Sequence, residues 1–148
     1  MRLSVHPKMI DISGQMSAFR NYLSHNDQIV TIFLFGSYDT KYQTPLSDLD
    51  LAILTREPVS DEEELEILST VSSILQEDDV NITFLNKTNL LMQYKILSTG
   101  RLLYCADQIV LADFTEGVIK FYGDFQIDLE QFYREYDRKL REEYLYGR

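Results

Sequence analysis

Asp48 and Asp50 are the residues whose types and spacing point most directly to chemistry. They stand in the stretch LSDLDLAIL, where the intervening Leu49 is apolar. In a strand, residues two apart point to the same face, so these two carboxylates would lie close enough to share a divalent cation. Two ionised carboxylates at that separation repel each other, and bound Mg²⁺ would offset the repulsion. The alternative is an edge strand with a solvated acidic face.

Gly36 and Ser37 favour the metal interpretation. They follow the hydrophobic run IVTIFLF, and ten residues separate them from Asp48. Backbone N–H groups and a hydroxyl at a turn of this kind can bind a phosphate. The missing Cβ of Gly36 lets a ligand approach the main chain. We therefore predict a nucleotide-phosphate site at Gly36 and Ser37, next to the metal site.

The motif Gly36-Ser37, ten residues and Asp48-Leu49-Asp50 resembles the signature of the DNA polymerase beta-like nucleotidyltransferase superfamily. With TIFLFGSY, TPLSDLDLAIL and LLMQYKILSTGRLLYCAD, it is similar to the minimal nucleotidyltransferase (MNT) antitoxins of HEPN ribonuclease toxins, over about 29–107. The resemblance implies a polymerase beta-like palm fold and transfer of AMP from ATP to a tyrosine of the partner toxin. It also implies that Gly36 and Ser37 hold the triphosphate and that the two aspartates hold two Mg²⁺ ions.

Asn81 stands in VNITFL, where the family usually has a third carboxylate. We count Asn81 with Asp48 and Asp50 as the catalytic residues. Its amide can coordinate Mg²⁺ through the carbonyl oxygen, but it adds no negative charge and cannot act as a base. Asp79, two residues earlier, would substitute for the missing acid only if the strand extends that far. Otherwise Asp79 is a loop residue before the strand.

Lys41 marks a second departure from the family. Many relatives have Ala-Arg-Gly after Gly-Ser-Tyr, whereas this chain has Asp39-Thr40-Lys41. We predict that Lys41 supplies the positive charge toward phosphate, as a flexible point charge rather than a planar fork. A solvated lysine is the alternative.

The pattern of apolar residues predicts eight elements in the order α, β, β, α, β, α, β, α. Helices are expected at 13–26, 60–77 and 88–97, strands at 29–36, 49–55, 80–86 and 101–105, and a mostly helical segment at 108–148. The helix at 60–77 should be capped by Ser60 and should pack through one apolar face. That face is Leu65, Leu68, Val71, Ile74 and Leu75. This order predicts an α+β (mixed α/β) fold, a small mixed sheet flanked by helices. We expect one domain over 1–148, with a core at about 28–107.

The C-terminal segment 108–148 carries two further expectations. Gly117, Gly123 and the stretch GDFQID suggest a break in the helix. The last part sets four apolar residues along one stripe: Leu129, Phe132, Tyr136 and Leu140. We expect this stripe to pack on the core, with a partner-binding helix as the alternative.

The composition indicates which partners fit. A net charge of -10 over 148 residues argues against direct binding of nucleic acid and favours a basic partner protein. The partner implied by the resemblance is a HEPN toxin, with assembly as a homodimer or as a hetero-oligomer with the toxin. One cysteine and the lack of a long apolar run predict a cytoplasmic protein without disulfides or membrane contact.

Three functions follow from these residues. The first is the antitoxin-type adenylyltransferase that the resemblance implies. The second is a catalytically weakened antitoxin that acts by binding, which Asn81 motivates. The third is a stand-alone nucleotidyltransferase for a small hydroxylated molecule such as an aminoglycoside, for which the chain is short.

Overall fold

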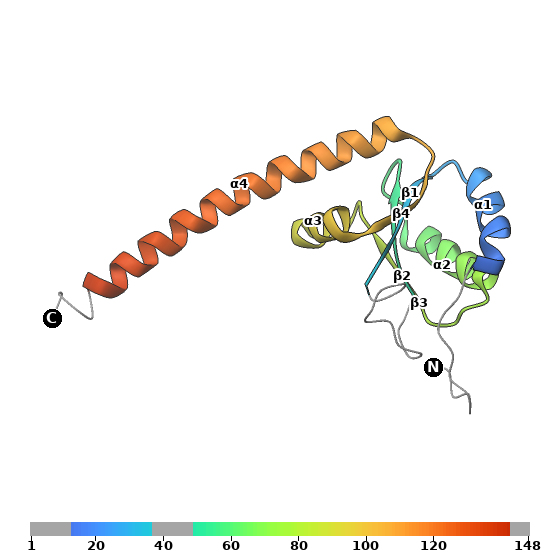
Figure 1. Ribbon diagram of the computed structural model, residues 1–148, viewed down its shortest axis with the longest axis horizontal. Coiled ribbons are helices and arrows are strands. Elements are labelled where there is room, and N and C mark those ends of the chain that lie inside the picture. The colour runs from blue at the N-terminus through green and yellow to red at the C-terminus, as the bar shows by residue number, and fades with distance from the viewer. Residues whose placement is uncertain (1–12, 37–48, 143–148) are drawn as a thin grey trace, which may run out of the picture.

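The computed structural model describes residues 13–36 and 49–142, which form four α-helices and four strands in the predicted order (Figure 1). A short 3-10 turn, η1 (Ser13–Gln15), precedes them. The helices are α1 (Met16–Ser24), α2 (Asp61–Leu75), α3 (Leu90–Thr99) and α4 (Gln108–Arg141). The strands are β1 (Ile29–Phe35), β2 (Leu49–Thr55), β3 (Val80–Phe84) and β4 (Arg101–Cys105). The α+β prediction is confirmed.

The four strands form one mixed sheet in the order β3-β2-β1-β4. Strand β1 is antiparallel to both β2 and β4, whereas β2 and β3 are parallel. Strand β1 lies between two neighbours and is buried over almost its whole length, as its apolar and β-branched sequence predicts. This topology brings the last residues of β1 to the same end of the sheet as the first residues of β2, β3 and β4.

Helices cover both faces of the sheet. On one face, Phe19 of α1 and Val71 of α2 pack against strand residues such as Leu51. On the other face, Ile96 of α3 joins Phe33 and Ala52, and the start of α4 adds Val110 and Phe114. Alternate residues of each strand therefore enter different cores, which sets the face that each polar residue at a strand end can reach.

Helix α2 begins as predicted, because the Ser60 hydroxyl accepts a hydrogen bond from the Glu63 N–H at 3.2 Å. Its predicted face is confirmed at Val71 and Leu75, which are buried, and at Leu68 and Ile74, which pack against the same core, but it is wrong at Leu65. The buried side chains are Ile67, Val71 and Leu75, whereas Leu65 is 66% exposed. The spacing of four residues sets this face, and Leu65 falls outside it because it lies two residues before Ile67.

Helix α4 runs unbroken over 34 residues, so the predicted break near Gly117 and Gly123 is wrong. A single glycine inside a helix costs only about 1 kcal/mol, which flanking turns can offset. Val118 is buried and Tyr122 stacks on Tyr94 of α3, with ring centroids 3.8 Å apart.

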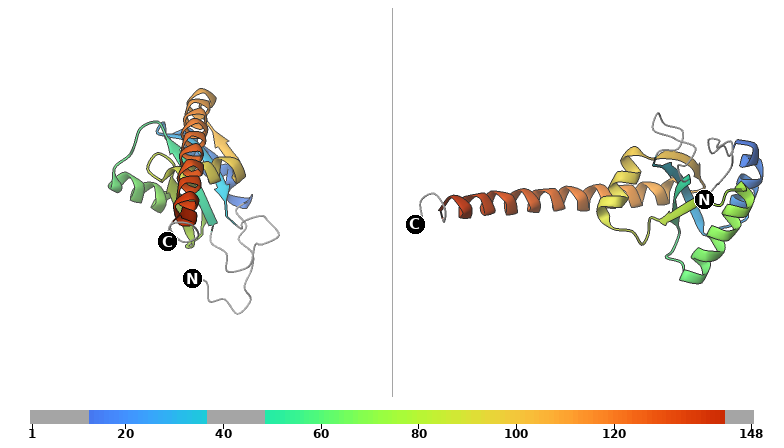
Figure 2. Two further views of the ribbon diagram at one scale, coloured as in Figure 1. Left: turned by 90° about the vertical axis from the view of Figure 1, so that its left-hand side faces the viewer. Right: turned by 90° about the horizontal axis from the view of Figure 1, so that it is seen from below.

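Beyond the Tyr94–Tyr122 stack, α4 projects away from the sheet (Figure 2), and residues 124–142 are all exposed. The expectation that the stripe of the last helix packs on the core is therefore wrong. At about 1.5 Å per residue, α4 is about 51 Å long, which is longer than the small sheet it starts from. None of the helices within 13–36 and 49–142 combines the length and apolar character needed to cross a membrane.

Candidate active site at one end of the sheet

Asp50, the second residue of β2, lies in the middle of the candidate site. It is in register with Phe35 of β1 on one side and with Asn81 of β3 on the other. Its neighbours Leu49 and Leu51 are buried in the core beneath α1 and α2, so Asp50 points to the other face of the sheet. The carboxylate is half-buried at the end of the sheet. The strand pairing thus holds it between two other strands.

Gly36 ends β1 next to this carboxylate. Its φ is +80°, a backbone conformation that side chains with a Cβ rarely adopt. A Cβ added there would also collide with the Asp50 carboxylate. The sequence predicts glycine here for the approach of a ligand. The structure adds a second requirement, because only glycine leaves room for Asp50.

Asn81 is brought to Asp50 as the motif predicts. The Asn81 Nδ2 donates a hydrogen bond to the Asp50 Oδ1 at 3.3 Å. The donor is an uncharged amide, so it stabilises the carboxylate without adding a second negative charge beside it. Asn81 is exposed, which leaves this pair at the surface of the sheet end.

Asp79 immediately precedes β3, which begins at Val80. The Asp79 carbonyl oxygen accepts a hydrogen bond from the Leu49 N–H at 2.8 Å, so its main chain helps to set the start of β2. The condition under which Asp79 would replace the missing acid, a strand extending through it, is not met. The interpretation as a residue before the strand fits the structure.

Asp48, Ser37 and Lys41 lie outside the described residues, so their predicted roles stay predictions. Within 13–36 and 49–142, no three His, Cys, Asp or Glu side chains form a group that could hold a metal. The residues that are described fit Mg²⁺ in type, since an Asp carboxylate and an Asn amide offer the hard oxygen ligands that it prefers.

Arg101 is a basic residue that the sequence motif did not identify. It begins β4 in register with Leu34, so the sheet brings it to the same end as Asp50. Leu34 belongs to the core under α1 and α2, which places Arg101 on the opposite face from Asp50. Only the β1–β4 pairing reveals this position, because the two strands are far apart in the sequence.

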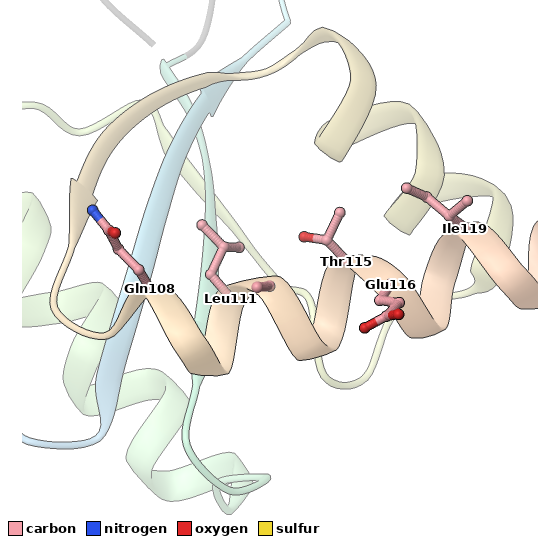
Figure 3. A pocket seen from close by; sticks show the side chains of 6 residues that line it. Gln108, Leu111, Thr115, Glu116 and Ile119 are labelled. Carbon is pink, nitrogen blue, oxygen red and sulfur yellow. The ribbon is translucent and has the colours of Figure 1, made fainter.

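A cavity of about 540 Å³ lies along the first half of α4 (Figure 3). Its walls are Gln108, Leu111, Ala112, Thr115, Glu116 and Ile119. Gln108, Leu111, Thr115 and Ile119 project from the same side of the helix in Figure 3. None of these residues comes from the end of the sheet that carries Asp50. The described residues that line this cavity are therefore not those of the candidate active site.

The fold and this site define a nucleotidyltransferase core. The family model described as polymerase beta, nucleotidyltransferase, matches residues 18–109. This is more than half of the chain, and the protein belongs to that family. No curated protein sequence matches the chain.

Solved structures share the fold at low sequence identity. A chain of a toxin–antitoxin crystal structure with AMP-PNP is 21% identical, with a TM-score of 0.65, covering 82% of this chain and 96% of that one. A chain from a tri-AMPylated Shewanella oneidensis HEPN toxin in complex with MNT antitoxin is 20% identical, with a TM-score of 0.61 and coverages of 82% and 93%. A chain of the toxin–antitoxin MntA-HepT is 18% identical, with a TM-score of 0.59 and coverages of 82% and 94%.

Proposed function

We propose that this protein is an antitoxin that transfers AMP from ATP to a tyrosine hydroxyl of a partner HEPN ribonuclease toxin and so neutralises it. The observation that carries the proposal is the contact between Gly36 and Asp50. A glycine at the end of one strand, next to a carboxylate on the neighbouring strand, fits the nucleotidyltransferase motif. Support for the partner comes from the similar structures, which include a toxin–antitoxin structure with AMP-PNP and an AMPylated HEPN toxin in complex with MNT antitoxin.

The proposed reaction joins the tyrosine oxygen to the α-phosphorus of ATP. The bond from that phosphorus to the β-phosphate oxygen breaks, pyrophosphate leaves, and the tyrosine proton passes to solvent. Gly36 and Ser37 bind the triphosphate through main-chain N–H groups and a hydroxyl. Asp48 and Asp50 hold Mg²⁺, which supplies charge stabilisation to the phosphate oxygens when it is bound. Lys41 adds positive charge near the phosphates.

Asn81 supports a second candidate function, in which the protein neutralises the toxin mainly by binding. Its amide donates to Asp50 and cannot accept a proton from the attacking tyrosine. In this case nucleotide and metal binding survive while transfer is slow. The proton of the acceptor hydroxyl then has no carboxylate at position 81 to receive it.

A stand-alone enzyme for a small hydroxylated molecule has less support. Such an enzyme needs an acceptor pocket beside the nucleotide site, with polar groups that orient the acceptor. Among the described residues, those that line the 540 Å³ cavity all belong to α4, and none of them is Gly36, Asp50 or Asn81. An acceptor in that cavity would not be held by the residues of the proposed reaction.

A transfer assay with radiolabelled ATP, Mg²⁺ and the product of the neighbouring gene tests the proposal. We expect label on the toxin with the wild type and none with Asp48→Ala or Asp50→Ala. Glu62→Ala is a matched control, because Glu62 is an exposed acid in the first turn of α2, away from the site. It should leave transfer unchanged.

Asn81→Asp separates the first two candidate functions. If the missing carboxylate limits the reaction, the rate of transfer should rise by about 100-fold or more, the usual scale of general-base catalysis. Neutralisation of the toxin without label on any residue, by the wild type and by Asn81→Asp, would reject transfer and favour binding.

A further inference from the structure

We infer that the part of α4 from Phe121 onward is a dimerisation surface that pairs in antiparallel orientation with α4 of a second copy of this chain. The surface is a stripe of six side chains that are 36% to 63% exposed, here called the distal stripe. It consists of Phe121, Phe125, Leu129, Phe132, Tyr136 and Leu140. At 100° per residue these six fall within an arc of about 100° on one side of the helix.

The distal stripe continues a face that is already used for packing. Phe114 packs against the core beneath α3 and α4, and Val118, one turn further on, is buried. Both residues fall in the same arc as the distal stripe. The same apolar face is thus covered by the protein's own core up to Val118 and is uncovered afterwards. Contiguous exposed apolar surface of this kind marks an interaction site.

The spacing within the distal stripe favours a second copy as the occupant. The six residues stand at i, i+4, i+8, i+11, i+15 and i+19, a series of intervals that is the same in both directions. Two antiparallel copies related by a two-fold axis therefore bring every stripe residue opposite another stripe residue. Phe121 faces Leu140 of the second copy, Phe125 faces Tyr136, and Leu129 faces Phe132. A different partner would not require intervals that read the same in reverse.

The charges along α4 favour the antiparallel orientation. Residues 121–130 carry three acids and no base: Asp124, Asp128 and Glu130. Residues 131–141 carry four bases, Arg134, Arg138, Lys139 and Arg141, against the two acids Glu135 and Asp137. Antiparallel pairing places the acidic half of each helix beside the basic half of the other, and it also opposes the two helix dipoles. Parallel pairing would place like charges together.

The inference goes beyond the proposed function, which concerns the end of the sheet. Sedimentation of the full chain tests it without ATP or toxin. We expect a mass about twice the 17.4 kDa of one chain for the wild type and a monomer for Phe132→Glu. Ile127→Glu is the matched control, since Ile127 is 56% exposed on α4 but lies outside the arc of the distal stripe. It should stay dimeric, and circular dichroism should show unchanged helix content in both variants.

Disulfide cross-linking tests the orientation. In a Cys105→Ser background, the double variant Phe125→Cys with Tyr136→Cys should form cross-linked dimers, because these positions face each other across the pair. Phe125→Cys alone should not cross-link, since the cysteines of the two copies lie far apart in the antiparallel arrangement. Cross-linking by Phe125→Cys alone would indicate a parallel pair and would overturn the inference.

A monomeric wild type at tens of micromolar would also overturn it. If Phe132→Glu then lost binding to the toxin, the distal stripe would be assigned to the toxin instead. The AMP-transfer assay is independent of this result, so failure of the dimer and failure of the proposed reaction are distinguishable.

Discussion

The end of the sheet around Asp50 and the second half of α4 are both open to solvent, but they depend on their residues in different ways. At the sheet end, Gly36, Asp50 and Asn81 come from three strands and meet within hydrogen-bonding or van der Waals distance. Along α4, six similar side chains repeat on one face of one helix and are 36% to 63% exposed. The arrangement of the sheet end depends on contacts between individual atoms, whereas the surface of α4 depends on a repeated pattern of apolar side chains.

This difference indicates how each region tolerates substitution. One added methyl group at Gly36 meets the carboxylate that the proposed chemistry needs. One large-to-small change in the distal stripe removes a fraction of an extended apolar surface and leaves the fold intact.

Gly36→Ala should reduce transfer of AMP by about 100-fold or more, because a displacement of about 1 Å in the site is enough for a loss of this size. The strained φ of +80° and the collision with Asp50 act together. The measurement is the rate of label transfer to the toxin. Gly123→Ala is the control, because a Cβ there meets nothing within 4 Å. Wild-type activity in Gly36→Ala would contradict the assignment of the site.

Val118→Ala should lower the free energy of unfolding by about 2 kcal/mol, because it removes a buried side chain where α4 packs on the core. Phe132→Ala should change it by less than about 0.5 kcal/mol in chain dilute enough to be monomeric. Urea unfolding of both variants measures the difference. Equal losses would mean that the distal stripe is covered within one chain.

Asn81→Asp should lower the thermal midpoint by about 2–4 °C without Mg²⁺, equivalent to about 1 kcal/mol in a chain of this size. The change removes the amide donor to Asp50 and puts two carboxylates side by side. Added Mg²⁺ should then raise the midpoint more in the variant than in the wild type. An identical response to Mg²⁺ in both proteins would argue against a metal held at this pair.

Asp107→Asn should have the smallest effect, and the effect should depend on pH. The hydrogen bond from Arg56, followed by the one from the Val110 N–H, holds the pKa of Asp107 below its ordinary value of 3.8. A carboxyl with a lowered pKa in the folded state contributes stability above its ordinary pKa and loses it as pH falls through the folded value. Thermal midpoints of wild type and variant should therefore differ at pH 6 and converge below about pH 3.8. A constant difference would contradict this role.

Much of the fold follows from local patterns. The eight elements occur in the predicted order, and the strand LDLAILT has the predicted limits, because buried strands need β-branched and aliphatic runs. The continuity of α4 was not predicted, since the cost of Gly117 and Gly123 depends on the helix around them. The exposure of its stripe was also missed. Periodicity identifies an apolar face but not the surface that covers it.

The candidate site was predicted in part. The sequence motif identifies Gly36, Asp50 and Asn81, and the structure brings these three together. The motif could not indicate that Gly36 is required by Asp50 itself, because that contact depends on the pairing of β1 with β2. The motif also gave no indication of Arg101, which lies at the same end of the sheet but on the opposite face, because its position depends on the pairing of β1 with β4.

The stack of Tyr94 on Tyr122 makes α4 a lever arm with its pivot on α3. About 28 Å of helix extends from Tyr122 to Arg141 at 1.5 Å per residue. A tilt of about 10° at the pivot would therefore move the far end by about 5 Å, roughly the rise of one helical turn. Small changes in the packing of α3 would therefore produce larger displacements of the distal stripe. The stacking of Tyr94 on Tyr122 thus helps to set the direction in which the distal stripe meets the second copy.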